Sequence, residues 1–343
     1  MLREIFEQPN ALAKTFSMLA MHKRQITDLI SSDIRSILFI ARGTSDHVAD
    51  YGQYLFPLKC GLAATSLAPS IVTAYKSKLL LDSTLVISIS QSGSTSEIVE
   101  ATQWAKQMGA KTLAITNIAG SPLSEAADLA LVTQAGKEEA IPATKSYITA
   151  LAVLAYVAEC ISTDEQFLDE LNELPTILEF ILNSKGPYDR AAKAFKGVET
   201  AVIAGRGFTL GTAKEVAIKI KETSSINTIG ASAADLIHGP IAAFVPELPV
   251  ICIAPAVDSP VMEGIVNVAI RAKAARCNLI TIGGSAELVD VGGIHFPLPK
   301  VSEALTPFTA IVVGQILAER IAWINGRNPD RPAGLNKVTQ TIN

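Results

Sequence analysis

The sequence predicts an α/β protein with two tandem domains, each a parallel sheet flanked by helices. Short runs of β-branched residues alternate with longer amphipathic segments, which is the pattern of strand–helix–strand units. The alternation occurs in two series, separated by the acidic segment 163–173. The chain has 343 residues, of which 49% are hydrophobic and 18% are charged, so it can bury a sizeable core.

The first series predicts four strands and two helices. The strands are the apolar runs SILFIA (36–41), TLVISIS (84–90), TLAITN (112–117) and LALVTQ (129–134). Segment 96–110 has apolar residues at helical spacing and predicts a helix that ends near Gly109. Segment 147–161 predicts a buried helix, because its 15 residues fall short of the ~20 that span a bilayer.

The second series resembles the first at an offset of 164 residues. Its predicted strands are TAVIAG (200–205), PVICIAP (249–255) and LITIGG (279–284), with a helix in segment 260–276. The offset superimposes Arg42-Gly43 on Arg206-Gly207, and the element types coincide around both pairs, so we predict an internal duplication.

Composition excludes several classes of protein. The formal net charge is −4 and no run of Lys or Arg is present, which argues against nucleic-acid or anionic-membrane partners. The N-terminus lacks the apolar segment of a secretory signal, so we expect a cytoplasmic protein. The four cysteines stand singly in apolar runs and are expected to be buried, reduced thiols: Cys60, Cys160, Cys252 and Cys277.

The strand predicted at 84–90 runs into a loop rich in hydroxyl and amide side chains, "SQSGST". A strand that ends in Ser, Thr and Gly before a helix directs backbone N–H groups and hydroxyls at one point, which suits a phosphate. Helix capping alone needs one hydroxyl, whereas this loop offers four within six residues: Ser90, Ser92, Ser94 and Thr95. The second copy has "APAVDS" at this place, so only the first copy is expected to bind phosphate.

A second polar turn, "ARGTSDH", follows the strand predicted at 36–41. Loops at the carboxyl ends of neighbouring parallel strands face the same ligand, so Thr44 and Ser45 are expected at the phosphate as well. His47 falls in the first turn of a helix and is more simply explained as structural. "GRGFTLG" (205–211) is a weak match to a dinucleotide fingerprint and lacks its acidic partner.

The segment "KEVAIKIKE" places three charges on one helical face, since Glu215, Lys219 and Glu222 occupy positions i, i+4 and i+7. These side chains could form an acid–amine cluster or, alternatively, a solvated, salt-bridged surface. His238 precedes a Gly-Pro turn and adds an imidazole, which alone indicates nothing.

These motifs, in this order, resemble the double sugar-isomerase (SIS) domain family over nearly the whole chain. The tail "NPDRPAGLNKVTQT" and the loop "AGKEEAIPATKSY" complete the resemblance. The sequence is similar to the isomerase half of glucosamine-6-phosphate synthase and, more closely, to stand-alone SIS-type glucosamine-6-phosphate deaminases. The family implies two flavodoxin-like SIS domains, here residues 1–165 and 166–325, a tail (326–343) that closes on the site, and a homodimer with a shared active site.

The resemblance also implies roles for individual residues. Glu222 corresponds to the proton-shuttling glutamate, His238 to a ring-opening histidine donated by the other subunit, Lys337 to the C-terminal lysine, and Lys219 to a lysine beside the base. The substrate-binding positions that it implies are Thr44, Ser45, Ser90, Gln91, Ser92, Thr95 and Ile141. Ile229 stands where relatives have a carboxylate, and Asp235 stands where they have Glu. These differences leave the identity of the sugar undecided.

The resemblance therefore predicts an enzyme acting at C1 and C2 of a phosphosugar without metal or cofactor. The expected reaction is deamination of glucosamine 6-phosphate to fructose 6-phosphate and ammonia. The 343 residues contain no counterpart of the synthase's glutaminase domain, so glutamine hydrolysis is not expected of them. Two alternatives stay open: an isomerase or deglycase for another phosphosugar, and a non-catalytic phosphosugar sensor.

Overall fold

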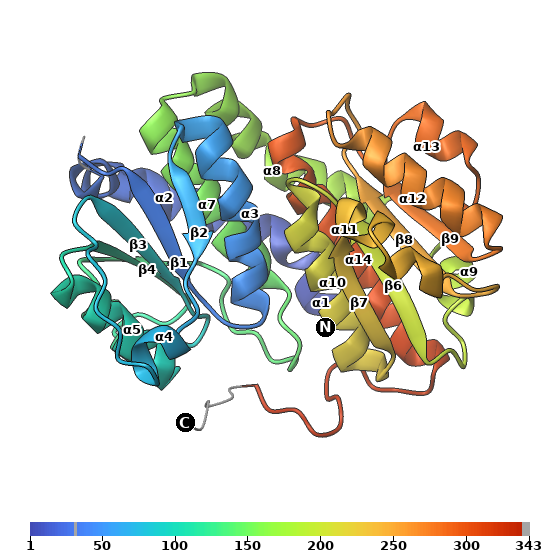
Figure 1. Cartoon of the computed structure of the whole chain (residues 1–343), viewed down its shortest axis with the longest axis horizontal. Coiled ribbons are helices and arrows are strands. Elements are labelled where there is room, and N and C mark those ends of the chain that lie inside the picture. Colours follow the sequence, from blue (N-terminus) through green and yellow to red (C-terminus); the bar gives the residue numbers. More distant parts are fainter. Residues whose placement is uncertain (31–32, 338–343) are drawn as a thin grey trace. The chain divides into compact units, whose positions relative to one another are not determined.

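The computed structural model describes residues 1–30 and 33–337. Within them the chain forms two five-stranded sheets, and every strand pair is parallel. Helices flank both sheets (Figure 1). The predicted α/β class with two sheets is therefore confirmed.

The first sheet has the strand order β2-β1-β3-β4-β5. Its strands are β1 (Ser36–Ile40), β2 (Ala63–Ser66), β3 (Thr84–Ile89), β4 (Lys111–Thr116) and β5 (Leu129–Val132). The four predicted strands are confirmed. The sequence did not predict β2, because this short edge strand, "AATS", is mostly exposed and lacks an apolar run.

The helices of the first half of the chain are α1 (Leu2–Phe6), α2 (Gln8–Leu29), α3 (Thr44–Cys60), α4 (Ser70–Thr73), α5 (Ser96–Gln107), α6 (Pro122–Ala126), α7 (Lys145–Ser162) and α8 (Glu165–Asn183). Most of them connect or flank these strands, but α1 and the later part of α8 belong to the C-terminal unit. Right-handed crossovers place α3 and α5 on opposite faces, because β2 and β4 lie on opposite sides of the β1–β3 pair. In the core between α5 and the sheet, Ile98 and Ala101 of the helix belong to one cluster with Ile40 and Val86 of the strands.

The second sheet repeats this topology, with the order β7-β6-β8-β9-β10. Its strands are β6 (Thr200–Gly205), β7 (Asn227–Ser232), β8 (Pro249–Ala254), β9 (Asn278–Gly283) and β10 (Ile294–Phe296). Its helices are α9 (Tyr188–Lys193), α10 (Thr209–Ser224), α11 (Ala233–Ile237), η1 (Pro240–Ala243), α12 (Met262–Ala274), α13 (Ala286–Asp290), η2 (Glu303–Leu305) and α14 (Thr306–Ile324). The corresponding order of strands is what the predicted duplication requires.

Contacts divide the chain into two compact units that exchange short segments. The N-terminal unit comprises Asn10–Glu138 and Lys145–Glu173, with Asn336 and Lys337 of the described tail. The C-terminal unit comprises Met1–Pro9, Glu139–Thr144 and Leu174–Leu335. The domain boundaries expected at 165/166 and 325/326 stay predictions.

Among the described residues, two helices are long and apolar enough to cross a membrane by length and composition: α7 and the η2–α14 segment Glu303–Ile324. The structure extends the helix predicted at 147–161 to 18 residues. In each case 83% of the apolar window is buried inside the fold, as in the core helices of many folded proteins, so this is weak evidence for a membrane span.

The cysteines are only partly as predicted. Cys252 and Cys277 are buried, but Cys60 and Cys160 are half-buried because they lie near the ends of α3 and α7. Burial raises the pKa of the Cys252 thiol to about 12, and the same cause raises the pKa values of the other three. Thiolate chemistry near neutral pH is therefore disfavoured at all four positions.

Candidate active site

The first sheet changes direction between β1 and β3. From β1 the chain passes through α3 to the edge strand β2 and then returns to form β3 on the other side of β1. Ligands of open parallel sheets bind at such a point, beyond the carboxyl ends of the two strands. The loops that leave β1 and β3 there are 41–43 and 90–95. The predicted phosphate-binding residues therefore belong to two neighbouring loops at this end of the sheet.

The hydroxyls of loop 90–95 are clustered. Ser92 Oγ accepts hydrogen bonds from the backbone N–H of Ser94 at 3.3 Å and from Ser94 Oγ at 3.0 Å. Ser90 Oγ lies 3.5 Å from Thr95 Oγ1. Thr95 occupies the N-cap position of α5, yet its hydroxyl does not cap the helix. The cluster therefore exceeds what helix capping requires.

Gly93 allows this loop to form. Its φ of +60° lies in the left-handed region, and a Cβ at this position would lie 2.2 Å from Ser121 Oγ. The carbonyl oxygen of Gly93 accepts a hydrogen bond from the Leu123 N–H at 2.9 Å, and that of Gln91 accepts one from the Asn117 N–H at 3.0 Å. The loop is thus fixed by backbone contacts before any ligand arrives.

Thr44 and Ser45 begin α3, directly after Gly43, whose φ is +57°. A Cβ placed on Gly43 would meet nothing within 4 Å, so the space beside this turn is open. His47 lies in the first turns of α3 and is half-buried.

The corresponding turn in the second copy is filled. Gly207 also has positive φ, +61°, but a Cβ there would contact Val261 at 3.3 Å and Glu303 Oε1 at 3.5 Å. The loop after β8, residues 255–261, lacks the serine cluster, and its Ser259 Oγ accepts the Val261 N–H at 3.2 Å. An apolar side chain and a carboxylate thus occupy the surroundings that stay open in the first copy, and the predicted difference in phosphate binding stays a prediction.

The C-terminal unit contains the second group of predicted residues, on α10. Lys219 Nζ lies 2.6 Å from Glu222 Oε2 and 3.5 Å from Glu215 Oε1. The side chains of Glu215 and Lys219 are 0% and 1% exposed, whereas that of Glu222 is 24% exposed. The alternative of a solvated surface is therefore wrong, and Glu222 is the member of the cluster that a substrate could reach.

Close packing of two helices buries this cluster. A Cβ at Gly314 of α14 would lie 2.2 Å from Val216 Cγ2 of α10, so the glycine lets the two helices approach. Thr223 Oγ1 also donates a hydrogen bond to the Ala318 carbonyl oxygen at 3.4 Å. Sequence spacing could predict the shared face, but only tertiary packing determines that it is buried.

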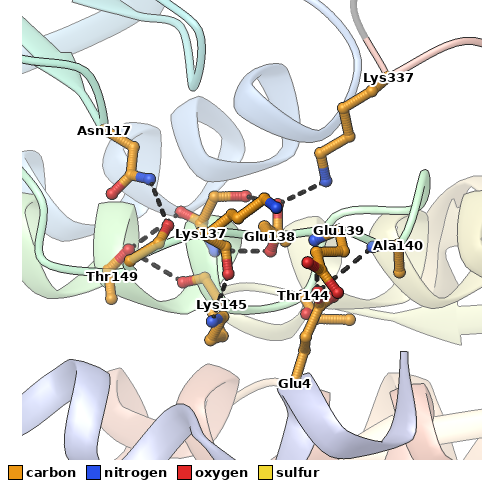
Figure 2. Close-up of polar contacts among 12 residues, drawn as sticks. Glu4, Asn117, Lys137, Glu138, Glu139, Ala140, Thr144, Lys145, Thr149 and Lys337 are labelled. Atoms are coloured by element: carbon orange, nitrogen blue, oxygen red, sulfur yellow. Dashed lines mark hydrogen bonds and ion pairs between the residues drawn. The ribbon is translucent and has the colours of Figure 1, made fainter.

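His238 and Ile141 belong to the same C-terminal unit. His238 is the exposed C-cap residue of α11. The Ile141 N–H donates to the carbonyl oxygen of Asp330 at 3.0 Å. Directly before Ile141, the buried Glu4 accepts hydrogen bonds through Oε1 from the N–H groups of Glu139 and Ala140 (Figure 2). Three successive backbone N–H groups are thus fixed, which determines the course of the loop at Ile141.

Lys337 belongs to the N-terminal unit, where it forms an ion pair that the sequence did not reveal. Its Nζ lies 2.9 Å from Glu138 Oε2 (Figure 2). The Glu138 side chain is 0% exposed, and it also accepts hydrogen bonds from the Ser146 N–H at 3.2 Å and from Ser146 Oγ at 2.9 Å. The nearby Lys145 Nζ donates to the Lys137 carbonyl oxygen at 2.8 Å. A buried carboxylate therefore holds the tail lysine.

The two parallel sheets, with a hydroxyl-rich loop where the strand order of the first one reverses, define the chain as an open-sheet α/β protein. The SIS domain family model matches residues 30–159, which contain both loops. Residues 30–159 thus belong to the SIS domain family, and the predicted resemblance is confirmed.

The similarity to known proteins extends beyond this segment. The chain is 36% identical to a glutamine–fructose-6-phosphate aminotransferase of Thermococcus kodakarensis, over 98% of this chain and 57% of that protein. It is 34% identical to the enzyme of the same name from Pyrococcus horikoshii, with the same coverage. The chain therefore spans little more than half the length of these curated relatives.

Solved structures agree with the fold. The C-terminal domain of glucosamine-fructose-6-phosphate aminotransferase from Francisella tularensis superimposes with a TM-score of 0.89 and 25% identity, over 97% of this chain and 98% of that one. A glucosamine-6-phosphate deaminase from Thermotoga maritima gives a TM-score of 0.78 at 23% identity, over 99% of both chains. The second likeness establishes the fold alone.

Proposed function

We propose that the protein catalyses proton transfer between C1 and C2 of a phosphosugar. The specific reaction that we propose is hydrolytic deamination of glucosamine 6-phosphate to fructose 6-phosphate and ammonia, in a cytoplasmic homodimer. The observation that carries the proposal is the buried Glu215–Lys219–Glu222 cluster, in which one carboxylate stays accessible. A protein that only binds phosphosugars has no evident need for it.

In this proposal the phosphate binds at the first sheet. The hydroxyls of Ser90, Ser92 and Thr95 and the N-terminal N–H groups of α5 donate to its oxygens, with Gln91, Thr44 and Ser45 from the same loops. The fixed loop conformation supports this role, because donors that are already oriented lose little entropy on binding.

We therefore expect Ser92→Ala to weaken phosphosugar binding about 10-fold to 100-fold, the value of one hydrogen bond to a charged group. Ser259→Ala, at the corresponding loop of the second copy, is the matched control and should leave affinity unchanged. Isothermal titration with glucosamine 6-phosphate measures both. Equal losses, or two sugar phosphates bound per chain, would contradict the assignment.

The chemical steps follow from the groups of the C-terminal unit. His238 moves the proton that opens the sugar ring, and its exposed position is consistent with donation to the site of a partner subunit. Glu222 removes the proton from C2 of the open-chain aminoaldehyde while the C1 oxygen gains a proton, which gives an enolamine. Glu222 then returns its proton to C1 as the amine loses one N–H proton, which gives an imine at C2. Water then adds to the imine and ammonia leaves, so that the ketose forms without net oxidation.

The remaining groups orient the reactants. Lys219 donates to Glu222 and fixes its rotamer, and Glu215 in turn fixes Lys219. Lys337 supplies a cation for the oxygen at C1 or in the ring, and the backbone at Ile141 contacts the sugar. Exclusion of water by the tail would strengthen these electrostatic contributions.

A panel of phosphosugars distinguishes this function from its rivals. The protein is incubated with glucosamine, glucose, galactosamine and fructosamine phosphates, and both ammonia and ketose are measured. Ammonia and fructose 6-phosphate in equal amounts support the deaminase. Ketose without ammonia indicates an isomerase, release from fructosamine phosphate alone indicates a deglycase, and tight binding without turnover indicates a sensor.

A further inference from the structure

The most informative contact outside the predicted site residues is an ion pair between the two loops proposed to bind phosphate. Arg42 Nε donates to Glu97 Oε2 at 3.1 Å, and Arg42 Nη2 donates to Glu97 Oε1 at 2.8 Å. Arg42 directly precedes the turn that begins α3, and Glu97 lies in the first turn of α5. The pair therefore links the loop after β1 to the first turn of α5, directly after the loop that follows β3.

The two partners differ in burial. The Glu97 side chain is 3% exposed, whereas that of Arg42 is 46% exposed. A carboxylate buried to this degree needs a cation or several hydrogen-bond donors, and a bidentate guanidinium provides both. Arg42 is thus the partner that makes a charge at Glu97 tolerable.

The position of Glu97 also matters for an anionic ligand. A carboxylate in the first turn of α5 occupies the same positive end of the helix that is proposed to receive the phosphate. Two anions only a few ångströms apart repel each other strongly when water is partly excluded. A phosphate dianion can therefore bind well only if the charge of Glu97 is cancelled.

We infer that Arg42 is a positioning residue for phosphate binding: it neutralises Glu97 and holds the two loops in register. The inference deepens the proposed function and rests on it for the location of the phosphate. Arg42 itself does not contact the ligand in this inference. The effect of its charge on phosphate binding therefore depends on the presence of Glu97.

A double-mutant cycle tests this dependence. We expect Arg42→Gln to weaken binding of glucosamine 6-phosphate at least about tenfold, because Glu97 then faces the phosphate unneutralised. Glu97→Gln should bind at least as tightly as the unmodified protein. The double variant Arg42→Gln/Glu97→Gln should recover to within about threefold of it. Affinities are measured by isothermal titration, with inorganic phosphate as a second probe.

The chain offers a matched control in an exposed ion pair between α5, which carries Glu100, and the segment after α4, which carries Lys76. Lys76 Nζ lies 2.9 Å from Glu100 Oε1, and both side chains are exposed, at 68% and 48%. Glu100→Gln and Lys76→Gln should each leave phosphate affinity within about twofold of the original, since exposed pairs contribute little. Thermal unfolding of every variant verifies that it is folded at the temperature of the titration.

The outcomes separate the inference from the proposed function. If the double variant binds as weakly as Arg42→Gln, then Arg42 acts on the phosphate itself and the inference is wrong. If Arg42→Gln behaves like Lys76→Gln, the inference is wrong too, while phosphate binding stands. If the unmodified protein binds neither phosphosugar nor phosphate, the proposed function fails instead. If Arg42→Gln fails to fold and the double variant Arg42→Gln/Glu97→Gln folds, the neutralising role of Arg42 is supported.

Discussion

Replacement of Glu222 by glutamine should lower kcat by a factor of about 10² to 10⁴, the usual contribution of a general base. Glutamine has nearly the shape of glutamate and can still accept a hydrogen bond from Lys219, but it cannot take a proton from C2. The KM for the phosphosugar should change little, because the phosphate is bound by other residues. Ketose and ammonia formation under saturating substrate measure the effect.

Glu263→Gln is the control for this prediction, since Glu263 is an exposed carboxylate of α12 in the same unit. It should leave kcat unchanged.

Mixing inactive Glu222→Gln and His238→Ala chains should restore part of the activity if each site takes His238 from the partner subunit. Full activity of Glu222→Gln would remove Glu222 from the mechanism. Absence of restoration in mixed dimers, with dimers verified by sedimentation, would contradict the shared site alone.

Replacement of Lys219 by methionine should lower the free energy of unfolding by about 3–5 kcal/mol. The ammonium lies between two carboxylates, and its removal takes a cation away from the fully buried Glu215 and from the partly buried Glu222. Methionine retains much of the volume, so a cavity would contribute little to the loss. Urea denaturation monitored by circular dichroism measures the change.

Lys221→Met provides the comparison, because Lys221 is an exposed residue of the same helix. It should change stability by no more than about 0.5 kcal/mol. The double variant Glu215→Leu/Lys219→Met should recover part of the loss, since it removes the buried anion together with its partner. A Lys219→Met protein as stable as Lys221→Met would show that the buried charges tolerate separation.

The periodicity of the sequence predicted those elements whose burial follows a regular pattern. The central strand β3 is buried at every residue and appears in the sequence as an uninterrupted apolar run. The edge strands β2, β7 and β10 were not predicted, because they are only partly buried and lack an uninterrupted apolar run. At such positions the pairing strand, rather than the strand's own sequence, determines the conformation.

The same distinction applies to the candidate site. The spacing of Glu215, Lys219 and Glu222 predicted a shared face because helix geometry is local. The partners Arg42 and Glu97 are 55 residues apart, and Glu138 and Lys337 are 199 apart. Sequence spacing contains no information about such pairs, so only the folded structure revealed them.

The exchange of short segments has a consequence for synthesis on the ribosome. Residues 1–9 are translated long before Leu174–Leu335, yet both segments belong to the same unit, and α1 packs on α14. At ~5–20 residues per second, roughly 15–65 s pass before that partner helix and its surroundings have been translated. Until then Glu4 and Ile5, which are 2% and 0% exposed in the finished fold, lack the neighbours that α14 supplies. Burial of α1 therefore depends on a helix made about 300 residues later, and the C-terminal unit cannot reach its final state before α14 has been translated.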